Sequence, residues 1–327
     1  MVTIKQIAKE SGVSKSTVSR YLNNGYVSEA TAKKIEKIIS KYNYSPNEFA
    51  RNLKIQKSNF IGVISPRLTS PSIMAILNGI DEVARKNGFQ MLISNTELAI
   101  KREIESIYSL VQNKVAGIIL LATEITEEHI KVANSIDVPI LFVGQSNEAV
   151  YSVDHDNYQA GVNLAQALLE YGHKEVLYVG VPENDLSVGI NRKQGVVTTF
   201  LENGITPQIV PSTFYPEDNY QLGLELLPQK NASLIICATD SMAMGVIKAA
   251  NQLNIAIGVE LSVAGFGGYS FGEYLYPPLT TVDFHHQLVG EKAACLMTEL
   301  LQGNEIARQT IVDTTMIIRN SVCAVKK

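Results

Sequence analysis

Residues 2–24 constrain the fold most, because they predict a pair of short helices joined by a tight turn. Ile4, Ile7 and Ala8 recur at the three- and four-residue spacing that places apolar side chains on one face of a helix. Gly12 follows one turn later, and glycine tolerates the positive φ that a tight turn between helices demands. The pattern therefore predicts a first helix that ends at this glycine.

The second helix of the pair is expected to begin after Ser14, whose hydroxyl can accept a hydrogen bond from a free backbone N–H. Val18 and Leu22 lie one turn apart and supply an apolar seam. A short helix of this kind can lie in the major groove of DNA, although an ordinary helical hairpin gives a similar local pattern. The side chains expected to face outward are small, polar or basic, namely Lys15, Ser16, Ser19 and Arg20.

This string resembles the helix-turn-helix of the LacI family of transcriptional repressors. The matching positions are Thr3, Ile4, Ile7, Ala8, Ser11, Gly12, Val13, Ser14, Thr17, Val18, Ser19, Arg20, Leu22 and Asn23. The resemblance implies a DNA-binding headpiece over residues 1–45. Within it, the DNA contacts implied by the resemblance are Thr3, Lys15, Ser16, Thr17, Ser19, Arg20 and Asn23.

A third helix is expected from residue 31 to residue 42, and residues 46–58 resemble the hinge helix and linker of the family. Pro46 suits the first turn of a short helix, where its missing N–H costs nothing. Leu53 either packs against a partner hinge helix or, as the resemblance implies, wedges between base pairs in the minor groove. The second role is favoured, because so short a helix is unstable alone in water. The resemblance adds Tyr44, Asn47 and Arg51 to the DNA contacts.

The charge of the chain is divided between a basic N-terminal segment and an acidic remainder. Residues 1–58 contain eleven Lys or Arg and four Glu, a balance of +7, whereas residues 59–327 contain 17 basic and 28 acidic residues, a balance of −11. This distribution is typical of a protein that contacts phosphates at one end only.

At 327 residues with 46% hydrophobic content, the chain can fill two or three domains. No run approaches the roughly 20 apolar residues that span a membrane, and the N-terminus does not resemble a signal segment, so a cytoplasmic location is expected. Cys237, Cys295 and Cys323 show neither paired nor metal-ligand spacing. Free thiols are expected, with no metal and no cofactor.

From Phe60 onward, short apolar runs alternate with amphipathic helical segments, which is typical of βαβ units and a parallel sheet. Strands are expected at 61–65, 90–94, 117–121, 139–143, 176–180, 234–237, 262–265 and 310–317. Helices are expected at 73–87, 101–113, 126–135, 157–171, 192–203, 241–253 and 286–301. Two sheets of about one hundred residues each predict two lobes rather than one core.

The resemblance implies that residues 59–327 form a periplasmic-binding-protein-like domain for effector binding and dimerisation. Lobe 1 is expected at about 59–155 plus 286–315, and lobe 2 at about 156–285 plus the C-terminus. The predicted fold class is thus an all-α helix-turn-helix headpiece followed by a two-lobed α/β domain with parallel sheets.

Ligands of parallel sheets collect at the carboxyl ends of the strands, so the candidate effector residues follow the predicted strands. Arg67 follows the first strand, where its guanidinium could bind a carboxylate or phosphate, or make a surface ion pair. Asp156 is expected to cap a helix, and the resemblance also makes it an acceptor for effector hydroxyls. With these two, the expected effector site comprises Ser70, Ile73, Arg192, Phe214, Thr239, Asp240, Phe266, Gly267 and Phe284.

Gly267 is the clearest departure from the family, whose sugar repressors commonly carry an acidic residue there. Together with Arg67, this change makes the predicted cleft more positive by two charges, which fits an anionic effector. Segments 23–28, 65–67 and 265–269 resemble the sucrose-operon repressors of low-GC Gram-positive bacteria, which phosphorylate disaccharides during uptake. A small sugar-phosphate effector such as sucrose 6-phosphate is therefore expected. A different sugar, or a phosphorylated carrier protein acting as corepressor, is the alternative.

A single recognition helix contacts only a few base pairs, so a homodimer on a pseudopalindromic operator is expected. The predicted helix 73–87 is apolar on more than one face, which fits either a dimer contact or full burial within lobe 1. The residues after 318 contain no leucine heptad for a tetramer.

Two other classes of protein fit the sequence less well than a regulator does. The sequence lacks a phosphate-binding loop, a dinucleotide fingerprint and a nucleophile elbow, so an enzyme is not expected. His285 and His286 are adjacent in sequence and are expected to point apart rather than hold a metal. A transport binding protein fits the two lobes but not the basic N-terminal segment.

Overall fold

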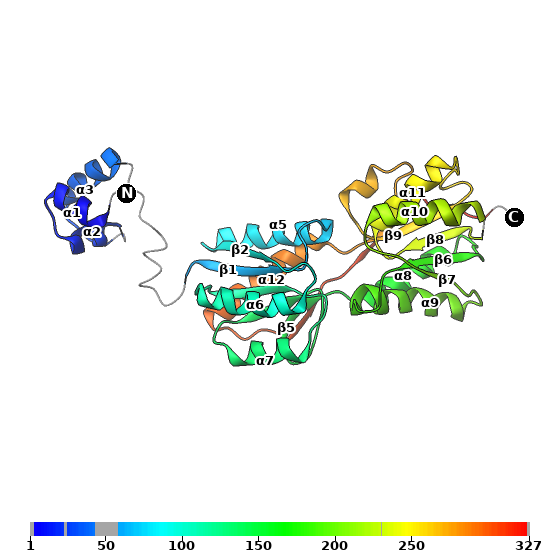
Figure 1. The fold of residues 1–327 in the computed structure, drawn as a ribbon, viewed down its shortest axis with the longest axis horizontal. Helices are drawn as coiled ribbons and strands as arrows, with labels where there is room; N and C mark the ends of the chain where they lie inside the picture. Colours follow the sequence, from blue (N-terminus) through cyan, green and yellow to red (C-terminus); the bar gives the residue numbers. More distant parts are fainter. Residues whose placement is uncertain (1–2, 23–24, 43–57, 230, 326–327) are drawn as a thin grey trace. The chain divides into compact units, whose positions relative to one another are not determined.

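The computed structural model describes residues 3–22, 25–42, 58–229 and 231–325, and the chain divides into two compact units, Met1–Ser58 and Asn59–Lys327 (Figure 1). Almost all of the segment predicted as hinge helix and linker lies outside the described residues. The same holds for the predicted DNA contacts Asn23, Tyr44, Asn47, Arg51 and Leu53.

The described part of unit 1 is a bundle of helices around a small apolar core. α1 spans Ile4–Ser11, α2 spans Lys15–Leu22 and α3 spans Glu29–Tyr42. Gly12 ends α1 with a φ of 69°, and Ser14 Oγ accepts a hydrogen bond from the Thr17 backbone N–H at 3.1 Å. The helix pair predicted from the residue pattern is confirmed. The side chains buried in its core are Ile7, Ala8, Val18 and Ile35.

Unit 2 contains two sheets, each of which is the centre of one lobe (Figure 1). The sheet of lobe 1 is parallel and has the strand order β11-β5-β4-β3-β1-β2. Alternate side chains of β3 pack into different apolar cores. Ile119 and Leu121 belong to the core on one face of the sheet, and Ile118 and Leu120 belong to the core on the other, so the sheet is buried on both faces. Its strands are β1 (Phe60–Ser65), β2 (Gln90–Asn95), β3 (Gly117–Leu121), β4 (Ile140–Val143), β5 (Tyr151–Asp154) and β11 (Gln309–Ile311).

Helices cover both faces of the lobe 1 sheet, which explains the continuous apolar strands. α5 (Pro71–Lys86) and α12 (His286–Gln302) pack together on one face. α6 (Ile100–Gln112) and α7 (Glu127–Ser135) cover the other. No helix in the described residues is long and apolar enough to cross a membrane.

Lobe 2 repeats this arrangement with the strand order β12-β10-β9-β8-β6-β7, in which only β12 is antiparallel to its neighbour among the described pairs. Helices α8 and α9 lie on one side of the sheet, and α10 and α11 on the other (Figure 1). The strands are β6 (Val176–Gly180), β7 (Gln208–Pro211), β8 (Leu234–Cys237), β9 (Ser262–Gly267), β10 (Thr280–Asp283) and β12 (Thr315–Ile317). The helices are α8 (Asn157–Leu169), the π-helix η1 (Leu186–Arg192), α9 (Lys193–Glu202), α10 (Pro216–Leu226), the short η2 (Leu227–Gln229), α11 (Asp240–Gln252) and the short η3 (Ser270–Glu273).

In the described part of unit 2, the chain passes between the lobes at three places: after β5, after β10 and after β11. The prediction of a single strand at 310–317 was wrong, because residues 312–314 connect β11 in one sheet to β12 in the other. Alternating apolar residues look the same whether a strand stays in one sheet or changes sheets. Elements β5, β7, β10 and α10 were not predicted. The three strands are four residues long and, unlike the wholly apolar β4 and β8 of the same length, they contain polar or proline residues.

The apolar helix considered as a dimer contact is largely buried within lobe 1. Ile76, Leu77 and Ile80 of α5 are buried, whereas Met74 is 45% exposed. Two glycines allow α5 and α12 to approach closely. A Cβ at Gly79 would lie 2.1 Å from the Gln287 carbonyl oxygen, and a Cβ at Gly290 would lie 2.0 Å from the Ile76 carbonyl oxygen. The structure therefore favours packing within the lobe for most of this apolar surface.

Candidate functional site

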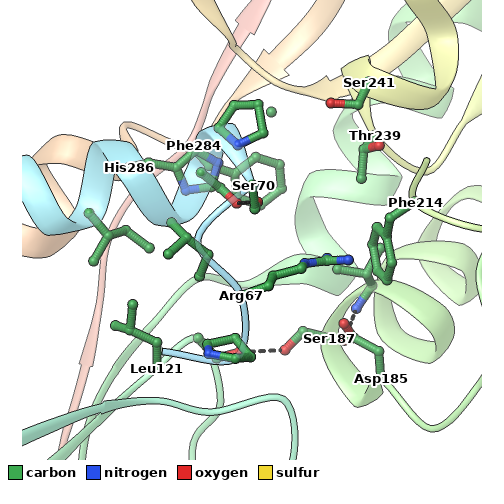
Figure 2. A pocket seen from close by; sticks show the side chains of 18 of the residues that line it. Arg67, Ser70, Leu121, Asp185, Ser187, Phe214, Thr239, Ser241, Phe284 and His286 are labelled. Carbon is green, nitrogen blue, oxygen red and sulfur yellow. Dashed lines mark hydrogen bonds between the residues drawn. The ribbon is translucent and has the colours of Figure 1, made fainter. Parts of the chain in front are cut away.

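A cavity of about 630 Å³ lies between the two lobes, where the carboxyl ends of strands from both sheets meet. Its wall on the lobe 1 side comes from the loop after β1, the start of α5 and the residues after β3 and β4. Its wall on the lobe 2 side comes from η1, the loop before α10 and the start of α11 (Figure 2). The volume lies in the range typical of small-molecule sites.

Arg192 is the buried cation of this cavity, 6% exposed, and is held in place by other groups of lobe 2. Its Nε and Nη2 donate to Asn157 Oδ1 at 3.3 and 2.8 Å, and its Nη1 donates to the Ala238 carbonyl at 2.7 Å. Its guanidinium also lies 4.4 Å from the centre of the Phe284 ring. A guanidinium has five N–H donors, so two remain for a ligand after these three contacts.

The π-helix η1 sets the position of Arg192, which is the last residue of that helix. Asp185 caps η1 by accepting a hydrogen bond from the Val188 backbone N–H at 2.9 Å. Ser187 in its first turn donates from Oγ to the Gly144 carbonyl of lobe 1 at 2.9 Å (Figure 2). π-helical turns are rare and frequently lie at functional sites. Here the turn both positions a cavity residue and connects the lobes.

Arg67 extends from lobe 1 across the cavity towards lobe 2 (Figure 2). Its guanidinium lies 4.4 Å from the centre of the Phe214 ring, a cation–π contact between the lobes. Among the described residues, no carboxylate lies within ion-pair distance of it. The structure therefore shows a guanidinium facing the cavity rather than a surface ion pair.

Three carboxyl groups in the cavity wall were missed by the sequence prediction, namely Asp154, Asp185 and Glu217. Asp154 is 6% exposed, and burial raises the pKa of its carboxyl to about 7. Burial also raises the pKa of the Asp185 carboxyl, although the nearby Arg192 and Arg67 act in the opposite direction. Asp154 ends β5, a strand of mixed polar and apolar residues that was not predicted, so reading the residues after predicted strands did not find it. Near neutral pH the Asp154 carboxyl therefore carries less negative charge than an exposed aspartate.

The raised pKa of the Asp154 carboxyl predicts that the stability of the folded protein depends on pH. The pKa of Asp154 is 3.8 in an exposed environment and about 7 in the folded protein, so the folded state loses stability as pH rises through this interval. Asp154→Asn should remove that loss and raise the free energy of unfolding at pH 8 by on the order of 1–4 kcal/mol, with little change at pH 4. Calorimetric unfolding midpoints measured from pH 4 to pH 8 provide the test.

Asp156→Asn is the matched control for that series, because Asp156 is exposed and asparagine caps a helix as well as aspartate does. Its unfolding midpoint should follow the wild type at every pH. A constant difference between Asp154→Asn and wild type across the whole pH range would contradict the assignment of the raised pKa to Asp154.

Three predicted effector residues do not line the cavity. Asp156 is exposed, and its Oδ1 accepts from the Gln159 backbone N–H at 2.8 Å, so it acts as the cap of α8. Asp240 is fully buried and accepts hydrogen bonds from Thr281 Oγ1 at 2.6 Å and from the Tyr269 backbone N–H at 3.0 Å. Phe266 is also fully buried, with its ring centre 5.0 Å from the Arg192 guanidinium. The sequence placed these residues near strand ends but could not give the direction of their side chains.

The remaining predicted effector residues do line the cavity, as the structure brings them together from both lobes. They are Arg67, Ser70, Ile73, Arg192, Phe214, Thr239, Gly267 and Phe284. Thr239 also caps α11, since its Oγ1 accepts from the Met242 backbone N–H at 3.3 Å. Polar lining residues absent from the predicted effector site are Thr69, Ser72, Thr123, Gln145, Asp154, His155, Asn157, Asp185, Ser187, Tyr215, Glu217, Ser241, Tyr269 and His286.

The candidate DNA contacts of unit 1 that the structure describes lie on α2, apart from Thr3, which is the N-cap of α1. Thr3, Lys15, Ser16 and Arg20 are exposed, whereas Thr17 and Ser19 are half-buried. The Ser14 and Thr17 hydroxyl groups lie 2.8 Å apart, and the Ser14 and Ser16 hydroxyl groups 2.7 Å apart. The outward face of α2 therefore presents hydroxyl groups between two cations, a combination that can contact phosphates and base edges.

Comparisons with known proteins agree with both parts of this description. A model for bacterial regulatory proteins of the lacI family matches residues 3–47, and one for a periplasmic binding protein-like domain matches residues 165–322. A sucrose operon repressor from Staphylococcus xylosus is 34% identical over 321 residues, which cover 98% of this chain and 100% of the relative. A ribose operon repressor from Lactococcus lactis subsp. lactis (strain IL1403) is 29% identical over 315 residues, with 95% and 94% covered.

The fold is also similar to solved structures. The crystal structure of the lac repressor dimer bound to operator and the anti-inducer ONPF aligns with a TM-score of 0.89, covering 99% of both chains at 22% identity. A LacI family transcriptional regulator from Enterococcus faecium with bound ribose aligns with a TM-score of 0.74, covering 82% of this chain and all of the other, at 22% identity. At these identities the likeness concerns the fold alone.

Proposed function

The chain belongs to the LacI family of bacterial regulatory proteins, and from that premise we propose that it represses a sugar-utilisation operon under the control of a phosphorylated disaccharide. Sucrose 6-phosphate is the specific candidate for the effector. The relatives are transcriptional regulators, in agreement with the expectation that the protein is not an enzyme.

The observation that carries the effector proposal is the Arg67 guanidinium, which faces the cavity without a carboxylate in ion-pair distance among the described residues. A guanidinium binds a phosphate through two parallel charge-assisted hydrogen bonds. The name of the Staphylococcus xylosus relative, a sucrose operon repressor, supports the disaccharide. The raised pKa of Asp154 reduces the repulsion that this carboxyl would exert on a phosphate.

The proposed control works through the two lobes. An effector in the cavity contacts both walls and so favours one angle between the lobes over others. In a homodimer on a pseudopalindromic operator, a change in this angle moves the two headpieces relative to each other, so effector binding and operator binding become coupled. A differential affinity of a few kcal/mol between the two states suffices for such control.

Arg67→Ala tests the phosphate assignment. The variant should bind sucrose 6-phosphate about ten- to a hundredfold more weakly, because it loses charge-assisted hydrogen bonds, while its affinity for free sucrose should change little. Isothermal titration calorimetry with sucrose 6-phosphate, sucrose and fructose phosphates measures these affinities. Arg102→Ala is the matched control, since Arg102 is a lobe 1 arginine paired with Glu97.

The second candidate effector is an uncharged sugar, and the observation that favours it is the pair of carboxyls at Asp154 and Asp185. Carboxylates are good acceptors for sugar hydroxyls, and both line the cavity. Tight binding of free sucrose by the wild type, without binding of sucrose 6-phosphate or fructose phosphates, would select this alternative and exclude the phosphorylated effector.

A further inference from the structure

The cavity wall contains a tyrosine in the space where a side chain at position 267 would lie. Gly267 is the last residue of β9, and its φ is 144°. A Cβ built on it would lie 2.8 Å from two carbon atoms of the Tyr269 ring. The missing side chain therefore does not leave an empty space, because an aromatic ring two residues later occupies it.

The turn that directs Tyr269 is fixed by buried hydrogen bonds. Asp240 Oδ2 accepts from the Tyr269 backbone N–H at 3.0 Å, and Asp240 Oδ1 accepts from Thr281 Oγ1 at 2.6 Å. Gly268 has a φ of 67°, and a Cβ there would lie 2.5 Å from Asp283 atoms. Asp240 thus positions the turn without lining the cavity, the glycine at 267 leaves room for the ring, and the glycine at 268 leaves room for Asp283.

The far end of the Tyr269 side chain reaches lobe 1. Its hydroxyl lies within hydrogen-bonding reach of the Ser72 hydroxyl on α5, and its ring centre lies 5.7 Å from that of His286 at the start of α12. Burial raises the pKa of Tyr269, so the phenol is neutral and can act as a hydrogen-bond donor. One side chain of lobe 2 therefore contacts both helices of lobe 1 that border the cavity.

We propose that Tyr269 is the residue that sets effector specificity on the β9 side of the cavity and that its contact with Ser72 helps to hold the lobes together around the effector. In place of a charged group at position 267, the cavity presents a neutral aromatic wall. Such a wall offers apolar contact to a sugar ring and does not repel a phosphate. This inference rests on the proposed function for the identity of the effector.

A double-mutant cycle tests the contact between the lobes. Tyr269→Phe and Ser72→Ala should each weaken sucrose 6-phosphate binding about threefold to tenfold, and the double variant should bind no more weakly than the weaker single variant. Tyr274→Phe is the matched control, because Tyr274 lies near the same turn and is 84% exposed. Additive losses in the double variant, or an equal loss in Tyr274→Phe, would overturn the proposal.

The role of Tyr269 in effector specificity is tested by introducing Gly267→Asp with Tyr269 present and with Tyr269 replaced by alanine. With Tyr269 present, the new side chain collides with the ring, so sucrose 6-phosphate binding should fall at least tenfold. In the Gly267→Asp/Tyr269→Ala double variant the ring is absent. Its affinity for free sucrose relative to sucrose 6-phosphate should be at least tenfold higher than that of Gly267→Ala/Tyr269→Ala, which carries the same backbone strain at a φ of 144°. An unchanged ratio would overturn the specificity role.

Failure of the proposed effector is distinguishable from failure of this inference. If wild type does not bind sucrose 6-phosphate, the effector assignment is wrong. The cycle is then evaluated from thermal unfolding midpoints of the ligand-free full-length protein, in which the structure shows the two hydroxyls within reach. Non-additive shifts from Tyr269→Phe and Ser72→Ala support the contact between the lobes, and additive shifts exclude it.

Discussion

Arg20→Ala is expected to abolish specific operator binding while leaving effector binding intact. Arg20 is exposed on α2, and its side-chain stem lies against Gly25, where a Cβ would be 2.6 Å from Arg20 Cγ. The guanidinium end is thus available for a base edge, a contact of about 1–3 kcal/mol in each half-site. Loss in both subunits of a dimer corresponds to a roughly thirtyfold to ten-thousandfold weaker complex.

A mobility shift with DNA from the protein's own promoter measures the operator affinity, and calorimetry with sucrose 6-phosphate measures effector binding in the same preparation. Arg85→Ala provides the control, because it removes the same charge from α5 in unit 2, where Arg85 pairs with Asp81 at 2.7 Å. Equal operator affinity of Arg20→Ala and wild type at the same salt concentration would refute the assignment of Arg20 to DNA contact.

Arg192→Met is expected to lose effector binding by about a hundredfold or more while retaining operator binding. Two N–H donors of this buried guanidinium remain for the effector, and each charge-assisted hydrogen bond contributes about 1.5–3 kcal/mol. Methionine has a similar length and keeps the apolar contact with Phe284, but donates no hydrogen bond. The operator complex of this variant should therefore no longer respond to the effector.

The comparison variant for Arg192→Met is Asn157→Ala, which keeps the guanidinium but removes its acceptor at 2.8 Å. A smaller loss of affinity is expected there, because the charge stays in the cavity and only its orientation changes. If Arg192→Met bound the effector as tightly as wild type, with unaltered release of operator DNA, Arg192 would have no role in effector recognition.

The effector site contains both residues that the sequence predicted and residues that it could not predict. Arg67 and Phe214 come from loops of different lobes, and both were predicted from their place after expected strands or from the family resemblance. Asp154 and Tyr269 were not, although they line the same cavity. A residue's distance along the chain from a strand end does not determine the direction of its side chain. For the same reason Asp240 was predicted to face the effector and instead supports the turn before Tyr269.

By itself the sequence determined the helix pair of unit 1 and the alternation of apolar strands with helices in unit 2. These patterns are local, because helix and strand periods depend on residues a few positions apart. Only the tertiary structure decided that β11 and β12 belong to different sheets, that the ring of Tyr269 fills the space beside Gly267, and that Ser187 contacts Gly144 across the cavity. Those contacts join residues distant in the chain, so they depend on how the two lobes pack together, which no local pattern encodes.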